Sequence, residues 1–194
     1  MINVNTLVEE EVRSEIFQPF ITSAQGGEVI VEVGTFVGGN LCRVGELIKH
    51  STKDIKLIGV DDFHFVNISN VSLSDAGLHF GEYDTRQESF YQTLLKNLDA
   101  YGLSNLVQLI DSDSIEASKL FQNNSIDLLF LDANHSYPYT TNELKAWIPK
   151  VKNGGIISGH DWPCDGIQMA VKENLSNNDI KITSTNGAYW TIKK

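Results

Sequence analysis

The sequence predicts an α/β fold in which helices cover both faces of a largely parallel sheet. Short, continuously apolar segments alternate with helical segments along the 194 residues, and this alternation is typical of parallel strands that are buried on both faces. Near the C-terminus, Asn186-Gly187 separates two strand-forming segments. Because an Asn-Gly pair in that setting favours a tight turn, we expect the sheet to end in an antiparallel hairpin. The pattern runs without a linker, so we expect one domain over residues 1–194.

Seven strands and five helical segments are expected from the apolar spacing. The strands are expected at residues 28–33, 55–60, 106–110, 126–131, 156–158, 180–183 and 189–192. The first helix is expected over about residues 6–24, the second from the glycine-rich loop to Ile48, and the third over about 86–101. A fourth helix is expected to begin at Asp113, and a fifth follows the fourth strand and ends at about Ile148. Pro19 is expected to end or kink the first helix. The segment 63–85 is irregular and rich in aromatic side chains, and a loop of this length is usually functional.

Composition and charge narrow the classes of partner. Hydrophobic residues make up 41% of the chain and charged residues 21%, which is typical of a globular domain. The formal net charge of −10 disfavours nucleic acid and anionic membranes as partners. No apolar run reaches the ~18–20 residues that cross a bilayer, and the acidic N-terminal segment does not resemble a secretory signal. Cys42 and Cys164 stand far apart without a CxxC motif, so we expect no disulfide framework or zinc knuckle and a cytoplasmic location.

The loop after the first strand, from Gly34 to Asn40, opens a helix at the place where open parallel sheets bind ligands. Gly34 and Gly39 have the spacing of a P-loop, but Asn40 stands in place of its lysine. Phe36 occupies the position at which a dinucleotide site needs its second glycine, and Glu32 adds a negative charge that disfavours a pyrophosphate. A ligand with a cationic centre and no phosphate fits this loop better. S-adenosylmethionine (SAM), which carries a sulfonium, is such a ligand.

Polar side chains also follow the second and third strands. Asp61 and Asp62 end the second strand, where a carboxylate commonly accepts hydrogen bonds from both ribose hydroxyls. Asp113, with Ser112 and Ser114 on either side, follows the third strand and is placed to accept from an adenine amino group. Asp113 is equally suited to cap the helix that begins there, and the two roles are compatible.

Five motifs occur in order at strand ends: EVGTFVGGN, GVDDF, LIDSDS, DLLFLDANHSY and KNGGIISGHDW. Together they resemble the class I SAM-dependent methyltransferases, in particular the subfamily with DG-x-H-[ST]-Y and GG-x-x-x-x-HD motifs. The resemblance covers roughly residues 28–192. It implies a Rossmann-like, seven-stranded sheet with helices on both faces and an antiparallel C-terminal hairpin. It also implies SAM as the methyl donor, bound by Glu32, Gly34, Thr35, Gly38, Gly39, Asn40, Asp61, Asp62, Ser112, Asp113, Ser114 and Asp132.

The loops after the fourth and fifth strands carry two carboxylates and two imidazoles: Asp132, His135, His160 and Asp161. Carboxylate oxygens suit Mg²⁺ or another divalent cation, and imidazole suits softer ions. His135 could act as a general base or could orient Asp132. The chain is similar to catechol-type O-methyltransferases, which implies Asp132 and Asp161 as metal ligands and His135 as the base. Those enzymes have Asp-Asn where this chain has Asp161-Trp162, so the third ligand would be His160 or water.

These features predict a methyltransferase that acts on an oxygen of a small-molecule acceptor, with Asp132 and His135 as catalytic residues. The segment 63–85 is expected to cover or line the acceptor pocket. A non-catalytic SAM-binding partner or sensor would carry the same loop and stays open as an alternative. A nicotinamide-dependent oxidoreductase is disfavoured by Phe36 and by the terminal hairpin. The N-terminal helix could form a lid or an interface in a homo-oligomer.

Overall fold

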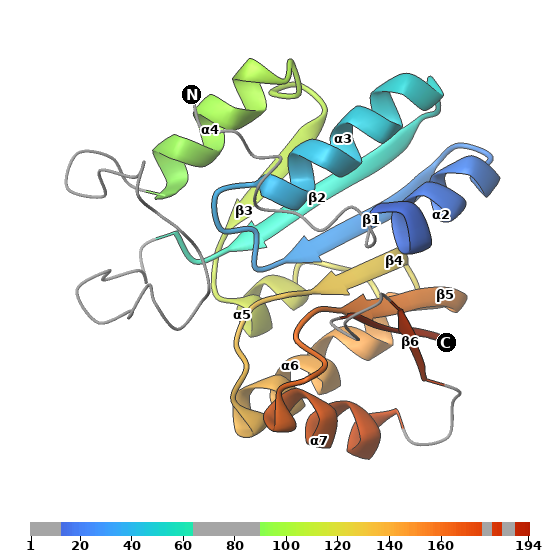
Figure 1. Cartoon of the computed structure of the whole chain (residues 1–194), viewed down its shortest axis with the longest axis vertical. Helices are drawn as coiled ribbons and strands as arrows, with labels where there is room; N and C mark the ends of the chain where they lie inside the picture. Colours follow the sequence, from blue (N-terminus) through green and yellow to red (C-terminus); the bar gives the residue numbers. More distant parts are fainter. Residues whose placement is uncertain (1–12, 64–89, 176–179, 184–188) are drawn as a thin grey trace.

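A seven-stranded sheet forms the centre of the computed structural model (Figure 1), which describes residues 13–63, 90–175, 180–183 and 189–194. The strand order is β3-β2-β1-β4-β5-β7-β6. The strands are β1 (Glu28–Val33), β2 (Ile55–Asp61), β3 (Val107–Asp111), β4 (Ile126–Leu131), β5 (Val151–Gly159), β6 (Lys181–Thr183) and β7 (Tyr189–Lys193). The first five strands pair in parallel, whereas β7 pairs antiparallel with both β5 and β6.

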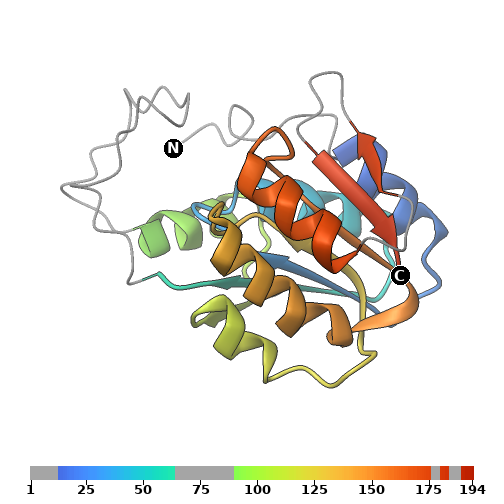
Figure 2. The ribbon, with the colours of Figure 1, turned by 90° about the horizontal axis from the view of Figure 1, so that it is seen from below.

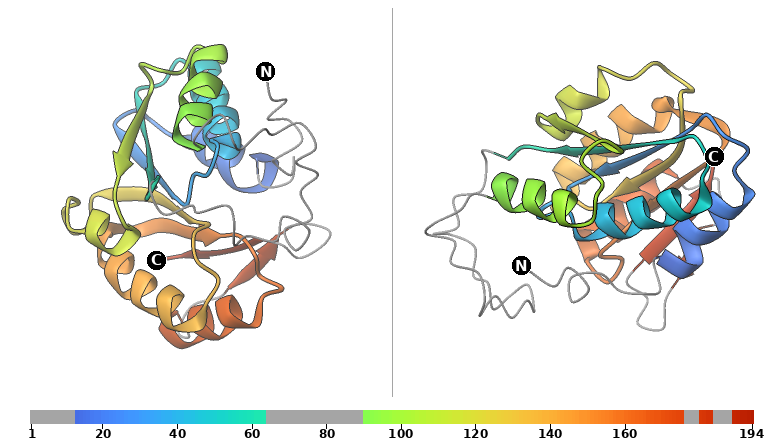
Figure 3. Two further views of the ribbon diagram at one scale, coloured as in Figure 1. Left: turned by 90° about the vertical axis from the view of Figure 1, so that its left-hand side faces the viewer. Right: turned by 90° about the horizontal axis from the view of Figure 1, so that it is seen from above.

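Helices cover the two faces of this sheet, as the views in Figures 2 and 3 show. One face carries α2 (Gln18–Ser23), α3 (Gly39–Ser51) and α4 (Phe90–Ala100). The other face carries α5 (Ser114–Ser118), α6 (Tyr137–Trp147) and α7 (Asp165–Asn174). A π-helical turn, η2 (Arg13–Phe17), precedes α2, and a 3-10 turn, η4 (Ile148–Lys150), follows α6. Among the helices of the described segments, none is both long enough and apolar enough to cross a membrane.

Each face of the sheet buries its own apolar core, because successive side chains of a strand point to opposite faces. In β1, Ile30 packs in the core under α2, α3 and α4, whereas Val31 packs in the core under α5, α6 and α7. Trp147 and Trp190 are the bulkiest side chains of the second core, and both are buried. Burial on both faces explains why the parallel strands are rich in Val, Ile and Leu, with few polar residues such as Glu32 and Asp127.

The strand order reverses between β1 and β4, which is the place where open α/β sheets bind ligands. The strands end in register there, because Val33 pairs with Leu131 and Leu131 pairs with Gly159. The segments that follow these residues therefore lie side by side. They are the glycine-rich turn after β1 and the Asp- and His-bearing loops after β4 and β5.

The structure confirms the α/β fold, the seven strands and the antiparallel end of the sheet. Strand β5 begins at Val151, earlier than expected, and its Lys-Asn-Gly-Gly segment forms an irregularity within the strand, where Gly154 has a left-handed φ of 83°. Pro19 lies in the first turn of α2 and does not end that helix, since the first turn needs no N–H from it. Residues 6–12, nearly all of the segment 63–85, and Asn186-Gly187 lie outside the described residues.

Candidate active site

The turn after β1 lies directly against the end of β4. Gly34 has a φ of 86°, in the left-handed region that favours glycine, and its N–H donates to the carbonyl of Val60 at 2.9 Å. A Cβ on Gly34 would lie 2.1 Å from the carbonyl oxygen of Asp132. Gly38, with a φ of 79°, ends the turn, and α3 begins at Gly39. Glycine at position 34 therefore allows the turn and the loop after β4 to touch.

Asp61, at the end of β2, supports the same turn with its side chain. Its Oδ2 accepts hydrogen bonds from the backbone N–H groups of Thr35 and Phe36, at 2.7 and 2.8 Å. Phe36 needs such support because its φ of 49° is left-handed in a residue that has a Cβ. Burial raises the pKa of Asp61, although the two N–H donors favour its charged form. Asp62, the next residue, is half-buried.

Glu32, on β1, places a buried carboxylate beside the turn, with 2% of the residue exposed. Its Oε2 accepts a hydrogen bond from Nδ2 of Asn40 at 3.0 Å. Burial, together with the charge of Asp132, raises the pKa of Glu32 well above its ordinary range. Within the described residues, the buried Oδ1 of Asn40 has no hydrogen-bond partner.

A buried carboxylate next to an unpartnered amide oxygen suits a ligand with positively charged donors, because buried acceptors are normally satisfied. The α-ammonium group of SAM is such a donor, and its sulfonium adds a second positive charge. The side chains of Glu32 and Asn40 therefore fit SAM.

Asp113 caps α5, which confirms the prediction of an N-cap at this position. Its Oδ1 accepts from the backbone N–H groups of Ile115 and Glu116, at 2.9 and 3.2 Å. Its Oδ2 accepts from the hydroxyl of Tyr139 at 2.6 Å. Burial would raise the pKa of Asp113, but these hydrogen bonds outweigh it and lower the pKa. Ser112 donates its hydroxyl to the carbonyl of Asp113 at 3.1 Å.

Ser114 is buried between α5 and α6 and links two side chains of α6. Its hydroxyl donates to Oε1 of Glu143 at 2.5 Å and accepts from the indole N–H of Trp147 at 3.0 Å. Glu143 is 1% exposed, and burial raises its pKa to about 7 against the effect of the Ser114 bond. Glu143 lines the same small cavity as Asp132 and His135. Glu143 is not among the predicted site residues. The sequence feature that could have identified it is an acidic residue on the buried face of α6, one turn before Trp147.

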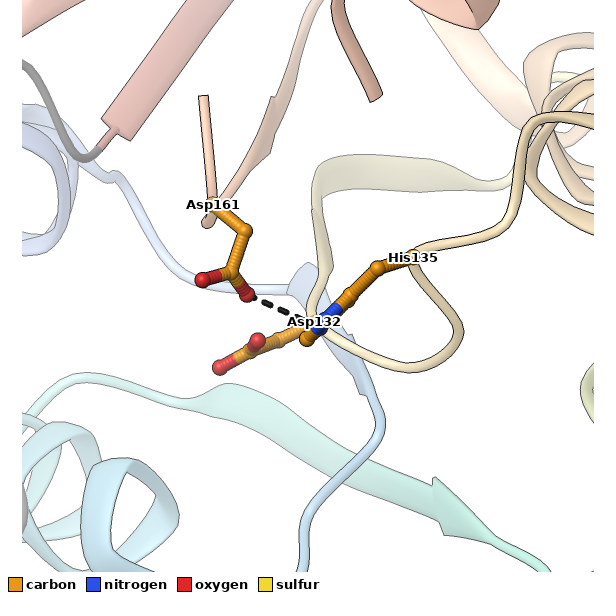
Figure 4. Close-up of side chains that lie close together, drawn as sticks. All are labelled: Asp132, His135 and Asp161. Carbon is orange, nitrogen blue, oxygen red and sulfur yellow. Dashed lines mark ion pairs between the residues drawn. The ribbon is translucent and has the colours of Figure 1, made fainter. Parts of the chain in front are cut away.

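The loops after β4 and β5 bring together Asp132, His135, His160 and Asp161. Nε2 of His135 lies 2.9 Å from Oδ2 of Asp161 (Figure 4). Nδ1 of His160 lies 3.1 Å from the same oxygen of Asp161 and 3.5 Å from Oδ1 of Asp132. Asp161 makes these contacts from a left-handed φ of 56°, and strained residues of this kind cluster at functional sites.

The side chains of this cluster perturb one another's pKa values. The hydrogen bond to Asp161 raises the pKa of His135 above its ordinary 6.5. Burial would lower the pKa of His160, but its bonds to Asp132 and Asp161 outweigh burial and raise the pKa to about 10. Burial raises the pKa of Asp132, whereas the two imidazoles lower the pKa of Asp161 despite burial. His160 therefore lies between two carboxylates that favour its charged form.

The cluster borders a cavity of about 10 Å³, which is the size of one water molecule. Ligand atoms of Asp132, His135 and Asp161 lie within 4.8 Å of one another. Two ligands bound at right angles, each about 2.1 Å from an ion, are about 3 Å apart, which is close to the 2.9 Å between His135 and Asp161. The donor set fits a divalent cation. His135 joins the two carboxylates in this grouping, whereas the sequence led us to expect His160.

The chain matches the family model described as a methyltransferase domain over residues 31–162, and it belongs to this family. No curated protein matches the sequence. The fold is similar to that of the O-methyltransferase NovP, with a TM-score of 0.71 and 15% identity, over 94% of this chain and 79% of that one. It is also similar to CalS11, a TDP-rhamnose 3′-O-methyltransferase, with a TM-score of 0.65 and 15% identity, over 98% and 83% of the two chains. A SAM-dependent O-methyltransferase from Thermotoga maritima has a TM-score of 0.60 and 15% identity, over 96% and 66%.

Family and fold together make the protein a class I SAM-dependent methyltransferase.

Proposed function

We propose that this protein transfers the methyl group of SAM to an oxygen of a small-molecule acceptor, with His135 as the general base. The observation that carries the proposal is the 2.9 Å contact between His135 and Asp161, beside a turn whose residues fit SAM. NovP, CalS11 and the Thermotoga protein are O-methyltransferases, which supports oxygen as the acceptor atom. The net charge of −10 favours a small molecule over nucleic acid as the acceptor.

The residues around the turn hold the methyl donor in this proposal. SAM supplies a methyl group that is already activated on a positively charged sulfur. Glu32 and Asn40 accept hydrogen bonds from its ammonium group, and Asp61 and Asp62 face its ribose. Alignment of donor and acceptor can account for about 7–11 kcal/mol of the barrier. Asp113 and Ser114 already bond to protein groups, so their contribution is to shape the adenine side of the site.

His135 accepts the proton of the acceptor hydroxyl. When its Nε2–H donates to Asp161, Nδ1 carries the lone pair that takes the proton. The new C–O bond forms as the C–S bond breaks, and the proton moves from the acceptor oxygen to Nδ1. The negative charge of Asp161 stabilises the imidazolium that results.

We also propose a divalent cation at Asp132 and Asp161, with His160 or water completing its ligands. A cation bound there would lower the pKa of an acceptor hydroxyl beside it. The mixture of imidazole and carboxylate suits Mn²⁺ as well as Mg²⁺. Thermal unfolding after chelation, with Mg²⁺ or Mn²⁺ added back, tests this part of the proposal. A wild-type melting temperature that neither ion raises, or a rise that is equally large in Asp132→Asn, would contradict it.

Calorimetric titration with SAM and with its demethylated product, S-adenosylhomocysteine, tests the donor site. Incubation with methyl-labelled SAM and a panel of hydroxyl-bearing acceptors tests the transfer. We expect binding of both ligands, label on an acceptor oxygen, and loss of transfer in His135→Gln. Binding without transfer to any acceptor would instead indicate a SAM-binding partner or sensor. Absence of binding at millimolar ligand would reject the donor site.

A further inference from the structure

Three consecutive residues of the turn after β1 are held by one helix, α4. The ring of Phe36 packs on the ring of Phe90, with centroids 4.5 Å apart and planes tilted by 57°. The carbonyl of Val37 accepts a hydrogen bond from Nδ2 of Asn97 at 2.9 Å. At Gly38, a Cβ would lie 2.3 Å from Cδ1 of Leu94, so the leucine side chain covers this glycine closely.

The three holding residues form a single stripe along α4. Phe90, Leu94 and Asn97 are spaced at i, i+4 and i+7, which places them on one face of a helix. All three are buried, and Asn97, at 4% exposed, is the polar member of the stripe. A buried asparagine is costly unless its groups are paired, so its bond to Val37 is a specific contact rather than general packing.

The turn depends on outside support for its shape. Phe36 has a left-handed φ of 49°, which a residue with a Cβ adopts only when its surroundings impose it. Asp61 binds the N–H groups of Thr35 and Phe36 from the side of β2. The stripe on α4 contacts Phe36, Val37 and Gly38 from the other side, so the turn is held between β2 and α4.

We propose that Asn97, together with Phe90 and Leu94, is a positioning residue for the methyl donor: it fixes the turn in the shape that binds SAM. This inference rests on the proposed role of the turn in binding SAM. A turn that is already in its binding shape loses little conformational entropy when the ligand binds, so affinity for SAM depends on these residues. Asn97 acts through Val37 and not by contact with the ligand.

Asn97→Leu tests the proposal, because it keeps the size of the side chain and removes the donor to Val37. Leu98→Val is the matched control, since Leu98 is buried in the core on the same helix. We expect Asn97→Leu to weaken binding of SAM and S-adenosylhomocysteine about tenfold. At saturating SAM, kcat and the KM for the acceptor stay within about twofold of wild type. Hydrogen exchange of residues 34–38 becomes faster than in the control at equal melting temperature.

The outcomes separate this inference from the proposed function. If Asn97→Leu and Leu98→Val bind SAM with equal affinity, the positioning role of Asn97 is wrong. Binding of SAM by the wild type would still support the donor site in that case. Wild type that binds neither ligand overturns the donor site and this inference together. If Asn97→Leu does not fold, Phe90→Leu replaces it, with the same expected loss of affinity and faster exchange in the turn. An unchanged affinity in Phe90→Leu then rejects the proposal.

Discussion

Nε2 of His135 and Oδ2 of Asp161 lie 2.9 Å apart and join the loops that follow two adjacent strands. In the proposed mechanism the contact decides which imidazole nitrogen takes the proton, because a neutral histidine that donates from Nε2 must accept at Nδ1. It also holds a half-exposed side chain in one orientation. The pair therefore links the chemistry of the loop after β4 to the position of the loop after β5.

Replacement of His135 by glutamine removes the proposed base and keeps a polar side chain. We expect kcat to fall by about 10²- to 10⁴-fold, while the affinity for SAM changes little, because the residues proposed to bind SAM lie on β1, β2 and α3. Steady-state kinetics and calorimetry measure the two effects. His50→Gln is the control, since His50 lies on the exposed end of α3. Equal kcat values in the two variants would remove His135 from the mechanism.

Asp161→Asn tests the orientation of His135. Asparagine tolerates the left-handed φ of 56°, so the backbone of the loop is retained while the charge is lost. We expect kcat to fall by at least about 100-fold, as when the aspartate that orients the histidine of a catalytic triad is replaced by asparagine. Asp165→Asn, at an exposed position at the start of α7, controls for loss of a nearby charge. If Asp161→Asn is as active as the control, Asp161 does not orient His135 for catalysis.

Gly34→Ala and Gly27→Ala separate the cost of a left-handed backbone from the cost of a close approach. Gly27 has a φ of 91°, and a Cβ there would meet nothing within 4 Å. We expect Gly27→Ala to lose about 1 kcal/mol of unfolding free energy. Gly34→Ala should lose at least about 2 kcal/mol more, because its Cβ would meet the carbonyl of Asp132 at 2.1 Å. Urea unfolding measures both, and Gly34→Ala should also bind SAM more weakly. Similar losses in both variants would contradict the close contact.

Glu143 gives the stability a dependence on pH that can be isolated by mutation. Burial raises its pKa from 4.5 to about 7 in the folded protein. Between these values the folded state holds a proton that the unfolded state has released, so unfolding free energy falls as pH rises from about 4.5 to about 7. The full effect is about 3 kcal/mol. We expect urea unfolding of Glu143→Gln between pH 4.5 and 8 to lack this part of the slope. A wild-type slope equal to that of the variant would show that Glu143 titrates normally.

The architecture was predictable because burial on both faces leaves a plain signal in sequence. Strands β1 and β4 are rich in Val, Ile, Leu and Phe, interrupted by Glu32 and Asp127, and the structure places them at the centre of the sheet. Helix α7 was not predicted, although Ile167, Ala170 and Val171 have helical spacing on a buried face. The start of β5 was missed because Gly154 and Gly155 are typical of a turn, whereas here they lie within a strand.

The residues of the site were predictable as a group, since the carboxyl ends of adjacent parallel strands meet at one edge of the sheet. Their pairings were not, because they depend on side-chain directions in irregular loops. Asp61 binds the backbone of the turn, and Ser114 faces Glu143 rather than an open crevice. The contact between Asn97 and Val37 joins segments far apart in the chain, and no local pattern encodes it.

The close contact between Gly34 and the carbonyl of Asp132 has a practical consequence for redesigning the acceptor specificity. The turn proposed to bind SAM follows β1, and the loop of the proposed base follows β4, a neighbouring strand about 4.8 Å away. Variants with substitutions away from β1 and β4 can therefore be screened for new acceptors without changing the distance between the proposed methyl donor and the proposed base. Substitutions at these two strand tips, by contrast, alter both partners of the transfer at once.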